Sequence, residues 1–222
     1  PKKWSKNAYV NKSQYEKKYK LSIKDNEGFW KKEGKRINWI RPYTKIKDIK
    51  YSKTEVRIKW YYDGTLNASA NCIDRHLKDK KNKTAIIWVG DDPKDSKQIS
   101  YQELHKNVSK VANGLKELGI KKGDRVAAYL PNIPETVIAY ISTAVLGAIW
   151  SSCSPDFGTA GVIDRFSQIS PKILFIGDKY FYNGKKINIL ERLPEILNKI
   201  PSINKVVVVP YPGTEIKKKK EK

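Results

Sequence analysis

The fold of this chain is constrained most by short apolar runs that alternate with amphipathic stretches of helical length in its second half. The apolar runs lie at 126–130, 148–153, 172–176 and 205–209, and the helical patterns at 134–146, 159–169 and 189–200. Parallel strands need long crossover connections, usually helices, so this order predicts a parallel sheet with helices on both faces. The unbroken valines Val206–Val209 predict a strand that is buried on both faces.

The stretch upstream of this alternation carries helix-end signals and one strand. Asn67 is expected to cap a helix, and the apolar run Thr84–Val89 predicts a strand. Ser100 and Glu103 form a capping-box pattern, and the helix that they open is expected to stop at Gly119.

Residues 1–60 are polar and aromatic and are expected to form an extension ahead of the α/β part. Helices are expected near 13–19 and 26–32, and an extended linker at 45–54. The tryptophans of this segment are interpreted as anchors that fasten it to a larger body: Trp4, Trp30, Trp39 and Trp60. The expected fold class is therefore α/β, a parallel sheet flanked by helices and preceded by an N-terminal extension.

The net charge of +22 raises the question of a nucleic-acid partner. Of the 45 basic residues, 38 are lysine and 7 are arginine, and the lysines are spread along the chain. Specific nucleic-acid recognition uses arginine forks, so we expect no nucleic-acid partner.

No apolar run reaches the length of a membrane span, and Pro1–Trp4 shows no secretory signal. We therefore expect a cytoplasmic protein with no membrane partner. Cys72 and Cys153 match no metal-ligand spacing and are interpreted as buried, reduced thiols.

The residues by themselves show no catalytic or metal-binding motif. The sequence contains neither G-x-x-x-x-G-K-[ST] nor G-x-G-x-x-G, and no G-x-S-x-G elbow. His76 and His105 have no cysteine or second histidine at metal-ligand spacing and are interpreted as surface or packing residues. We name no catalytic residue and no metal ligand, and the residues alone define an α/β domain whose ligand is unknown.

Different parts of the chain resemble two different enzyme families. Residues 66–77, 84–88, 90–93 and 99–105 resemble the start of the nucleotide-binding domain of acetyl-CoA synthetases, and residues 15–60 resemble the extension that precedes it. Residues 129–132, 147–158, 164–172 and 182–185 instead resemble acetoacetyl-CoA synthetases. An acetate enzyme would be expected to read Phe-Gly-Gly-Phe-Ser at 154–158. The chain is either a joined reading of the two families or a subgroup with mixed features, with the change near Arg125.

Both resemblances imply an AMP-forming short-chain acyl-CoA synthetase of the adenylate-forming superfamily. They imply an extension over residues 1–60 and an incomplete AMP-binding domain over 61–222. The implied enzyme is an acetate–CoA ligase, or alternatively an acetoacetate–CoA ligase, that uses ATP, CoA and magnesium. Its phosphate loop, its adenine and magnesium sites, its acyl pocket and its catalytic lysine are expected downstream, so this piece alone is expected to be inactive. A basic nucleic-acid-associated module and a non-catalytic CoA-binding domain remain the alternatives of other classes.

The resemblance also implies part of a CoA site in a basic turn. In acetate enzymes an Arg-x-Gly-Arg turn meets the nucleotide phosphate of CoA, and the matching positions here are Tyr182, Asn183, Gly184 and Lys185. Lys185 keeps a cation and Gly184 keeps the turn, but Tyr182 replaces an arginine. The alternative interpretation is a solvated basic loop.

A second turn is implied to lie beside the pantetheine channel of CoA. The matching positions are Ser154, Pro155 and Asp156, and the alternative is a strand-to-helix turn in which Ser154 or Asp156 caps the helix. Arg165 falls where both families carry arginine, and either a ligand contact or a surface salt bridge would explain it.

Overall fold

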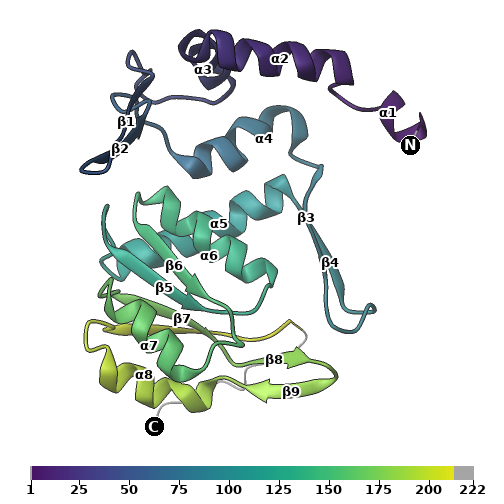
Figure 1. Cartoon of the computed structure of the whole chain (residues 1–222). Helices are drawn as coiled ribbons and strands as arrows, with labels where there is room; N and C mark the ends of the chain where they lie inside the picture. Colours follow the sequence, from purple (N-terminus) through teal and green to yellow (C-terminus); the bar gives the residue numbers. More distant parts are fainter. Residues whose placement is uncertain (1, 213–222) are drawn as a thin grey trace. The chain divides into compact units, whose positions relative to one another are not determined.

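The computed structural model describes residues 2–212 and divides the chain into two compact units, Pro1–Asn67 and Ala68–Lys222 (Figure 1). The N-terminal unit consists of α1 (Lys2–Lys6), α2 (Lys12–Lys24), α3 (Asn26–Glu33), the 3-10 turn η1 (Gly34–Arg36), β1 (Lys47–Tyr51) and β2 (Val56–Trp60). The helices expected near 13–19 and 26–32 are confirmed as α2 and α3.

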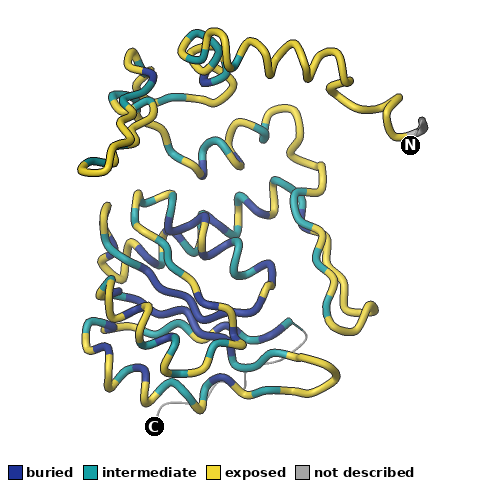
Figure 2. Tube along the Cα trace, in the orientation of Figure 1, coloured by how far each residue is buried: buried dark blue, intermediate teal, exposed yellow. Residues whose placement is uncertain are grey.

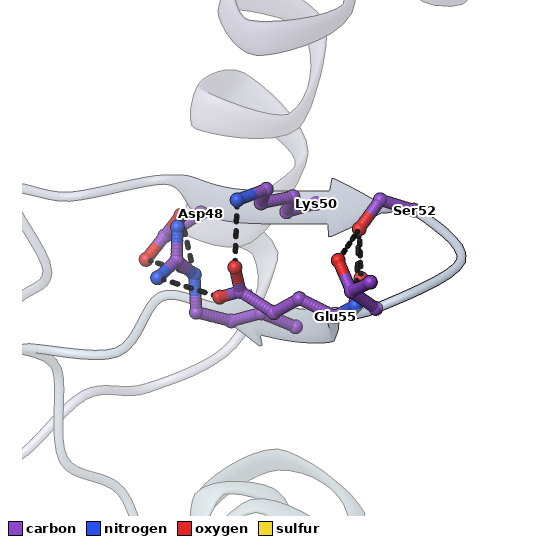
Figure 3. A network of polar contacts seen from close by, with 6 residues as sticks. Asp48, Lys50, Ser52 and Glu55 are labelled. Carbon is purple, nitrogen blue, oxygen red and sulfur yellow. Dashed lines mark hydrogen bonds and ion pairs between the residues drawn. The ribbon is translucent and has the colours of Figure 1, made fainter.

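The segment expected to be an extended linker, 45–54, instead contains β1, which pairs with β2 in an antiparallel hairpin. Charged side chains line this hairpin (Figure 3). The carboxylate of Glu55 lies 2.7 Å from the ammonium of Lys50 and 3.1 Å from the guanidinium of Arg57, which also reaches Asp48. Such half-exposed ion pairs add little stability, so the hairpin depends mainly on the pairing of its two strands.

Aromatic rings contact one another within the N-terminal unit. The rings of Trp30 and Trp60 lie 5.6 Å apart, and the ring of Trp39 lies 4.8 Å from Tyr43 and 5.5 Å from Tyr61. Three of the predicted anchors, Trp30, Trp39 and Trp60, therefore pack within their own unit, whereas Trp4 is largely exposed. The prediction that they fasten the unit to a larger body stays a prediction.

A carboxylate closes the loop that leads into this hairpin. Asp63 accepts hydrogen bonds from the hydroxyl of Thr44 at 2.5 Å and from the backbone N–H of Lys45 at 3.0 Å. These bonds stabilise the ionised form, the Thr44 hydroxyl most, and they lower the pKa of Asp63 from 3.8 to about 2.

Replacing Asp63 with Asn is expected to loosen this loop at neutral pH. The folded pKa lies below the ordinary value, so the stabilisation is present above pH 3.8 and is lost as the pH falls through about 2. Tryptophan fluorescence during urea unfolding, measured at several pH values, should therefore show a gap between wild type and Asp63→Asn that shrinks toward pH 2. Asp48→Asn, in the same unit, is the control, and an equal, pH-independent loss in both variants would contradict the role of Asp63.

The second unit holds the parallel sheet that the alternation predicts. Its elements are η2 (Ala70–Asp74), α4 (Arg75–Lys80), β3 (Thr84–Val89), β4 (Ser96–Ser100), α5 (Tyr101–Glu117), β5 (Arg125–Tyr129), α6 (Pro134–Val145), β6 (Ile149–Cys153), α7 (Thr159–Ser167), β7 (Ile173–Gly177), β8 (Lys179–Tyr182), β9 (Lys185–Asn188), η3 (Leu190–Arg192), α8 (Leu193–Lys199) and β10 (Lys205–Val209). The sheet has the order β10-β7-β5-β6, and every pairing in it is parallel, which confirms the α/β fold class.

Helices cover both faces of this sheet, as expected. Residues of α5 and α6 pack against one face, with Val126 and Ala128 of β5. Residues of α7 and α8 pack against the other, with Leu174 of β7. Figure 2 shows the buried residues concentrated in β5 and β7, the two inner strands.

The predicted helix ends are confirmed where side chains cap them. Ser100 and Glu103 form the reciprocal capping box that opens α5. Gly119, just beyond α5, has φ of +83°, a conformation that favours glycine and ends the helix. The helical turns ahead of β3 begin at residue 68, directly after Asn67, and the capping role of Asn67 stays a prediction.

Two predictions about burial are wrong. Among the described residues β10 has one neighbour, β7, and Val208 is 39% exposed, so the valine run forms an edge strand and is not buried on both faces. Cys153 is a buried free thiol as predicted, but Cys72 is exposed.

The hairpins β3–β4 and β8–β9 are antiparallel and lie outside the parallel sheet.

Candidate functional site

The candidate site lies at the carboxyl edge of the parallel sheet. The chain visits the strands in the order β5, β6, β7, β10, but β7 lies on the opposite side of β5 from β6. The connections after β5 and β7 therefore lead to opposite faces, toward α6 and α8 respectively. In open α/β sheets ligands bind outside the carboxyl ends of the strands at such a reversal.

A pocket of about 220 Å³ opens at this edge. Its walls come from the segments that follow all four strands of the sheet and from the β3–β4 hairpin. The lining residues are Trp88, Val89, Gly90, Asp91, Pro131, Asn132, Ile133, Ser154, Pro155, Tyr180, Phe181 and Tyr211. Aromatic rings and prolines share this lining with the polar side chains of Asp91, Asn132 and Ser154, a mixture that suits an amphipathic ligand segment.

The pocket wall is held together across the elements that form it. The indole N–H of Trp88 donates to the carbonyl oxygen of Asn132 at 3.0 Å, which fixes β3 to the segment after β5. The ring of Tyr211 lies 6.1 Å from Trp88 and 5.2 Å from Phe181. The pocket is therefore framed by side chains that are far apart in the sequence.

The turn after β6 is fixed from behind by two side chains. The hydroxyl of Tyr129 lies 3.0 Å from the carbonyl oxygen of Pro155 and 2.5 Å from that of Phe157. The Nη1 group of Arg192 donates to the Phe157 carbonyl at 2.7 Å, and it also donates to the Tyr129 hydroxyl. Burial raises the pKa of Tyr129, so its hydroxyl keeps its proton and can donate it at neutral pH.

The predicted phosphate-contacting residues sit at the tip of the β8–β9 hairpin. Asn183 and Gly184 have φ of 49° and 69°, as a two-residue type I′ turn requires. All four predicted residues of the tip, Tyr182, Asn183, Gly184 and Lys185, are exposed.

The structure brings only some of the predicted site residues together. Ser154 and Pro155 line the pocket, whereas Asp156 and the tip of the hairpin do not. Tyr180 and Phe181, in the strand that leads to the tip, do line it, so the tip projects from one wall of the pocket.

The expectation that Ser154 or Asp156 caps the following helix is wrong. The N-cap residue of α7 is Gly158, with no side-chain hydrogen bond. Arg165 donates to the carbonyl oxygen of Gly161 at 3.3 Å, and its guanidinium stacks 4.3 Å from the ring of Phe157. Arg165 therefore braces the same turn through an aromatic contact and not through a surface salt bridge.

The two histidines and the buried cysteine of the described residues contact structural neighbours and form no second reactive site. No group of three or more potential metal ligands is found among residues 2–212. His105 lies 3.4 Å from Asp74, and His76 lies against the ring of Tyr101 at 5.2 Å. Burial raises the pKa of Cys153, so its thiol is a poor nucleophile. Within the same residues no helix is long and apolar enough to cross a membrane.

Comparison with known proteins finds one family model for each part of the chain. The family model described as AMP-binding enzyme matches residues 73–222, and the one described as acetyl-coenzyme A synthetase N-terminus matches residues 15–72. The match to the AMP-binding model covers more than half of the chain, so the chain belongs to the family of AMP-binding enzymes.

Among curated relatives, acetyl-coenzyme A synthetase of Parvibaculum lavamentivorans is 43% identical over 213 residues, which are 96% of this chain and 33% of the relative. The enzyme of that name from Salmonella typhimurium is 42% identical over 209 residues, 93% of this chain and 32% of the relative. A solved structure of acetoacetyl-CoA synthetase from Streptomyces lividans superimposes with a TM-score of 0.79 at 29% identity, over 96% of this chain and 33% of that one. The chain thus spans about a third of the length of these relatives.

The family models meet between residues 72 and 73, and the compact units divide between 67 and 68. The domain boundary that the sequence places after residue 60 stays a prediction.

Proposed function

We propose that this chain is the N-terminal part of an AMP-forming acetate–CoA ligase. The observation that carries the proposal is the identity of about 40% to acetyl-coenzyme A synthetases that runs through both the extension and the AMP-binding segment. The proposed enzyme joins a short carboxylate to CoA in the cytoplasm, with ATP and magnesium.

The proposed reaction has two halves. The carboxylate oxygen attacks the α-phosphate of ATP, which releases pyrophosphate and leaves an acyl-adenylate. The thiol sulfur of CoA then attacks the acyl carbon, loses its proton and releases AMP. The residues that hold the transferring phosphate are proposed to lie downstream of this chain.

We assign the carboxyl edge of the sheet to CoA. The pocket of about 220 Å³ with aromatic and proline walls fits the mostly uncharged pantetheine arm. Lys185 has no carboxylate partner among the described residues and is exposed beside the Asn183–Gly184 turn, where an ammonium group can meet a phosphate. The seven proposed contact residues are Tyr182, Asn183, Gly184, Lys185, Ser154, Pro155 and Asp156.

Charge reversal at Lys185 tests this assignment. In the full-length enzyme, Lys185→Glu should raise the KM for CoA about tenfold or more, because losing a hydrogen bond to a charged group costs about 1.5–3 kcal/mol. The KM values for ATP and the carboxylate, and pyrophosphate exchange without CoA, should stay nearly unchanged. Dephospho-CoA, which lacks the 3′-phosphate, should be much less sensitive to the change.

Lys205→Glu is the matched control, because Lys205 is exposed at the start of β10, at the opposite edge of the sheet. This control should leave the KM for CoA unchanged. Equal effects of Lys185→Glu on ATP and CoA, or none on either, would show that the hairpin tip is only a solvated basic turn.

Acetoacetate is the second candidate substrate. Residues 154–158 depart from the sequence expected of an acetate enzyme, and the Streptomyces lividans acetoacetyl-CoA synthetase has a similar fold over nearly the whole chain. The two candidates are separated by measuring kcat/KM for acetate and for acetoacetate with the full-length enzyme. A higher value for acetoacetate would replace the first proposal.

A further inference from the structure

Arg192 occupies an unusual position behind the wall of the candidate site. It ends the turn η3 ahead of α8, and it is half-buried. Its Nη1 group lies 2.7 Å from the carbonyl oxygen of Phe157 and 3.3 Å from that of Pro155, and it also donates to the hydroxyl of Tyr129. One side chain thus connects η3, the end of β5 and the turn after β6.

No carboxylate balances this guanidinium among the described residues, since the partners of its Nη1 group are two carbonyl oxygens and a phenol. Hydrogen bonds from a charged donor are stronger than those between neutral groups. Tyr129 is fully buried, so its hydroxyl needs the partners that the turn and Arg192 offer. Loss of either the Arg192 or the Tyr129 side chain therefore removes hydrogen bonds that hold the carbonyl groups of Pro155 and Phe157 in position.

We propose that Arg192, acting with Tyr129, is a positioning residue that sets the Pro155–Phe157 turn in the geometry that CoA requires. Pro155 lies in the pocket wall, and its carbonyl oxygen is held from behind by both side chains. Arg192 itself is not among the residues that line the pocket, so it acts through the turn. This inference rests on the proposed function, because it assigns the turn to the CoA half of the reaction.

A positioning role for Arg192 differs from general support of the fold because it affects only the half-reaction that uses CoA. A turn that is displaced by a fraction of an ångström changes the placement of a ligand that lies against it, and a misplacement of about 1 Å can cost about 10²-fold in rate. The adenylation half uses ATP and the carboxylate, whose sites are proposed to lie downstream. Disturbing the turn should therefore impair the use of CoA while adenylation continues.

Arg125 offers a matched control within the same unit. Its guanidinium also binds backbone carbonyls, those of Ile169 at 2.6 Å and Ser170 at 3.1 Å. It stands at the start of β5, at the amino edge of the sheet, whereas Tyr129 ends the same strand at the carboxyl edge. Arg125→Gln and Arg192→Gln thus remove similar bonds at opposite edges.

The experiment uses the full-length enzyme and compares Arg192→Gln, Arg192→Lys, Tyr129→Phe and Arg125→Gln. Arg192→Gln should raise the KM for CoA about ten- to a hundredfold, while pyrophosphate exchange without CoA stays within about twofold of wild type, the spread expected of a site that the change does not reach. Arg192→Lys, which keeps a charged donor, should recover part of the loss.

Tyr129→Phe should raise the KM for CoA less than Arg192→Gln does. The effects of the two changes should not add fully, because both side chains bind the same turn. Arg125→Gln should lower the melting temperature without changing the KM for CoA.

Three outcomes would overturn the inference: an unchanged KM for CoA in folded Arg192→Gln, equal losses in both half-reactions, or the same kinetic profile in Arg125→Gln. If Arg192→Gln does not fold, Tyr129→Phe decides, because it removes a single oxygen. An unchanged KM for CoA in folded Tyr129→Phe then overturns the inference. Failure of the wild-type enzyme to use CoA would instead refute the proposed function.

Discussion

Replacing Leu174 with Asp is expected to unfold the α/β unit. Leu174 is completely buried in β7, between β5 and β10, and packs with residues of α7 and α8. An isolated carboxylate in such surroundings costs several kcal/mol, comparable with the ~5–15 kcal/mol stability of a typical domain. The soluble yield and the urea unfolding curve of the variant, followed by circular dichroism, would measure the loss.

Introducing Asp into the outermost strand of the sheet, β10, should destabilise the unit far less. Val208 lies in β10 and is 39% exposed, so Val208→Asp leaves its charge in contact with water. A loss of about 1 kcal/mol or less is expected from the poor strand propensity of Asp. Val207→Asp should fall between the two, because Val207 is only partly buried against the core. A soluble Leu174→Asp variant with an unchanged midpoint would contradict the assignment of β7 to the centre of the sheet.

Burial explains which parts of the fold the sequence predicts. Strands β5 and β7 are buried on both faces, so their side chains form unbroken apolar runs and their connections are helices. Two strands of the exposed hairpins read KDIKY and SKQIS, in which charged and polar residues hide any apolar period, whereas VRIKW alternates apolar and charged residues over only five positions. Their pairing depends on backbone hydrogen bonds, which leave no mark on side-chain composition.

The valine run shows a limit of the same reasoning. Val206–Val209 reads like a central strand, yet among the described residues it pairs with β7 alone. Composition reports that a strand packs against something apolar, but it does not report how many neighbours the strand has. The hairpin at Asn183–Gly184 was open to prediction, because Asn-Gly is the strongest short signal for a two-residue turn.

The candidate site is less predictable than the fold because its contacts span long stretches of chain. Arg192 and Tyr129 are 63 positions apart, and both bind carbonyl oxygens, which every residue carries. No local spacing could have revealed them. Ser154 and Pro155 were found only through the resemblance, and the structure places both in the pocket wall, while their role toward CoA stays a proposal.

Chemistry at the α-phosphate of ATP needs groups that we propose to lie downstream of this chain. Stabilising a transferring phosphoryl group takes donors and cations placed where negative charge develops, and removing one such donor typically costs about 10²–10³-fold in rate. The 222 residues contain no glycine-rich phosphate loop, and residues 2–212 hold no cluster of metal ligands.

The chain of 222 residues alone is therefore expected to release no pyrophosphate above the blank with acetate or acetoacetate, ATP, magnesium and CoA. The expected loss is complete, since all the phosphate-binding donors, and not one of several, are proposed to lie downstream. The measurement is a coupled pyrophosphate assay on the purified chain, with the full-length enzyme as the positive control. Release that depends on the added carboxylate would contradict the prediction. It would place the adenylation machinery within this segment, where neither the pocket at the sheet edge nor the hairpin tip provides it.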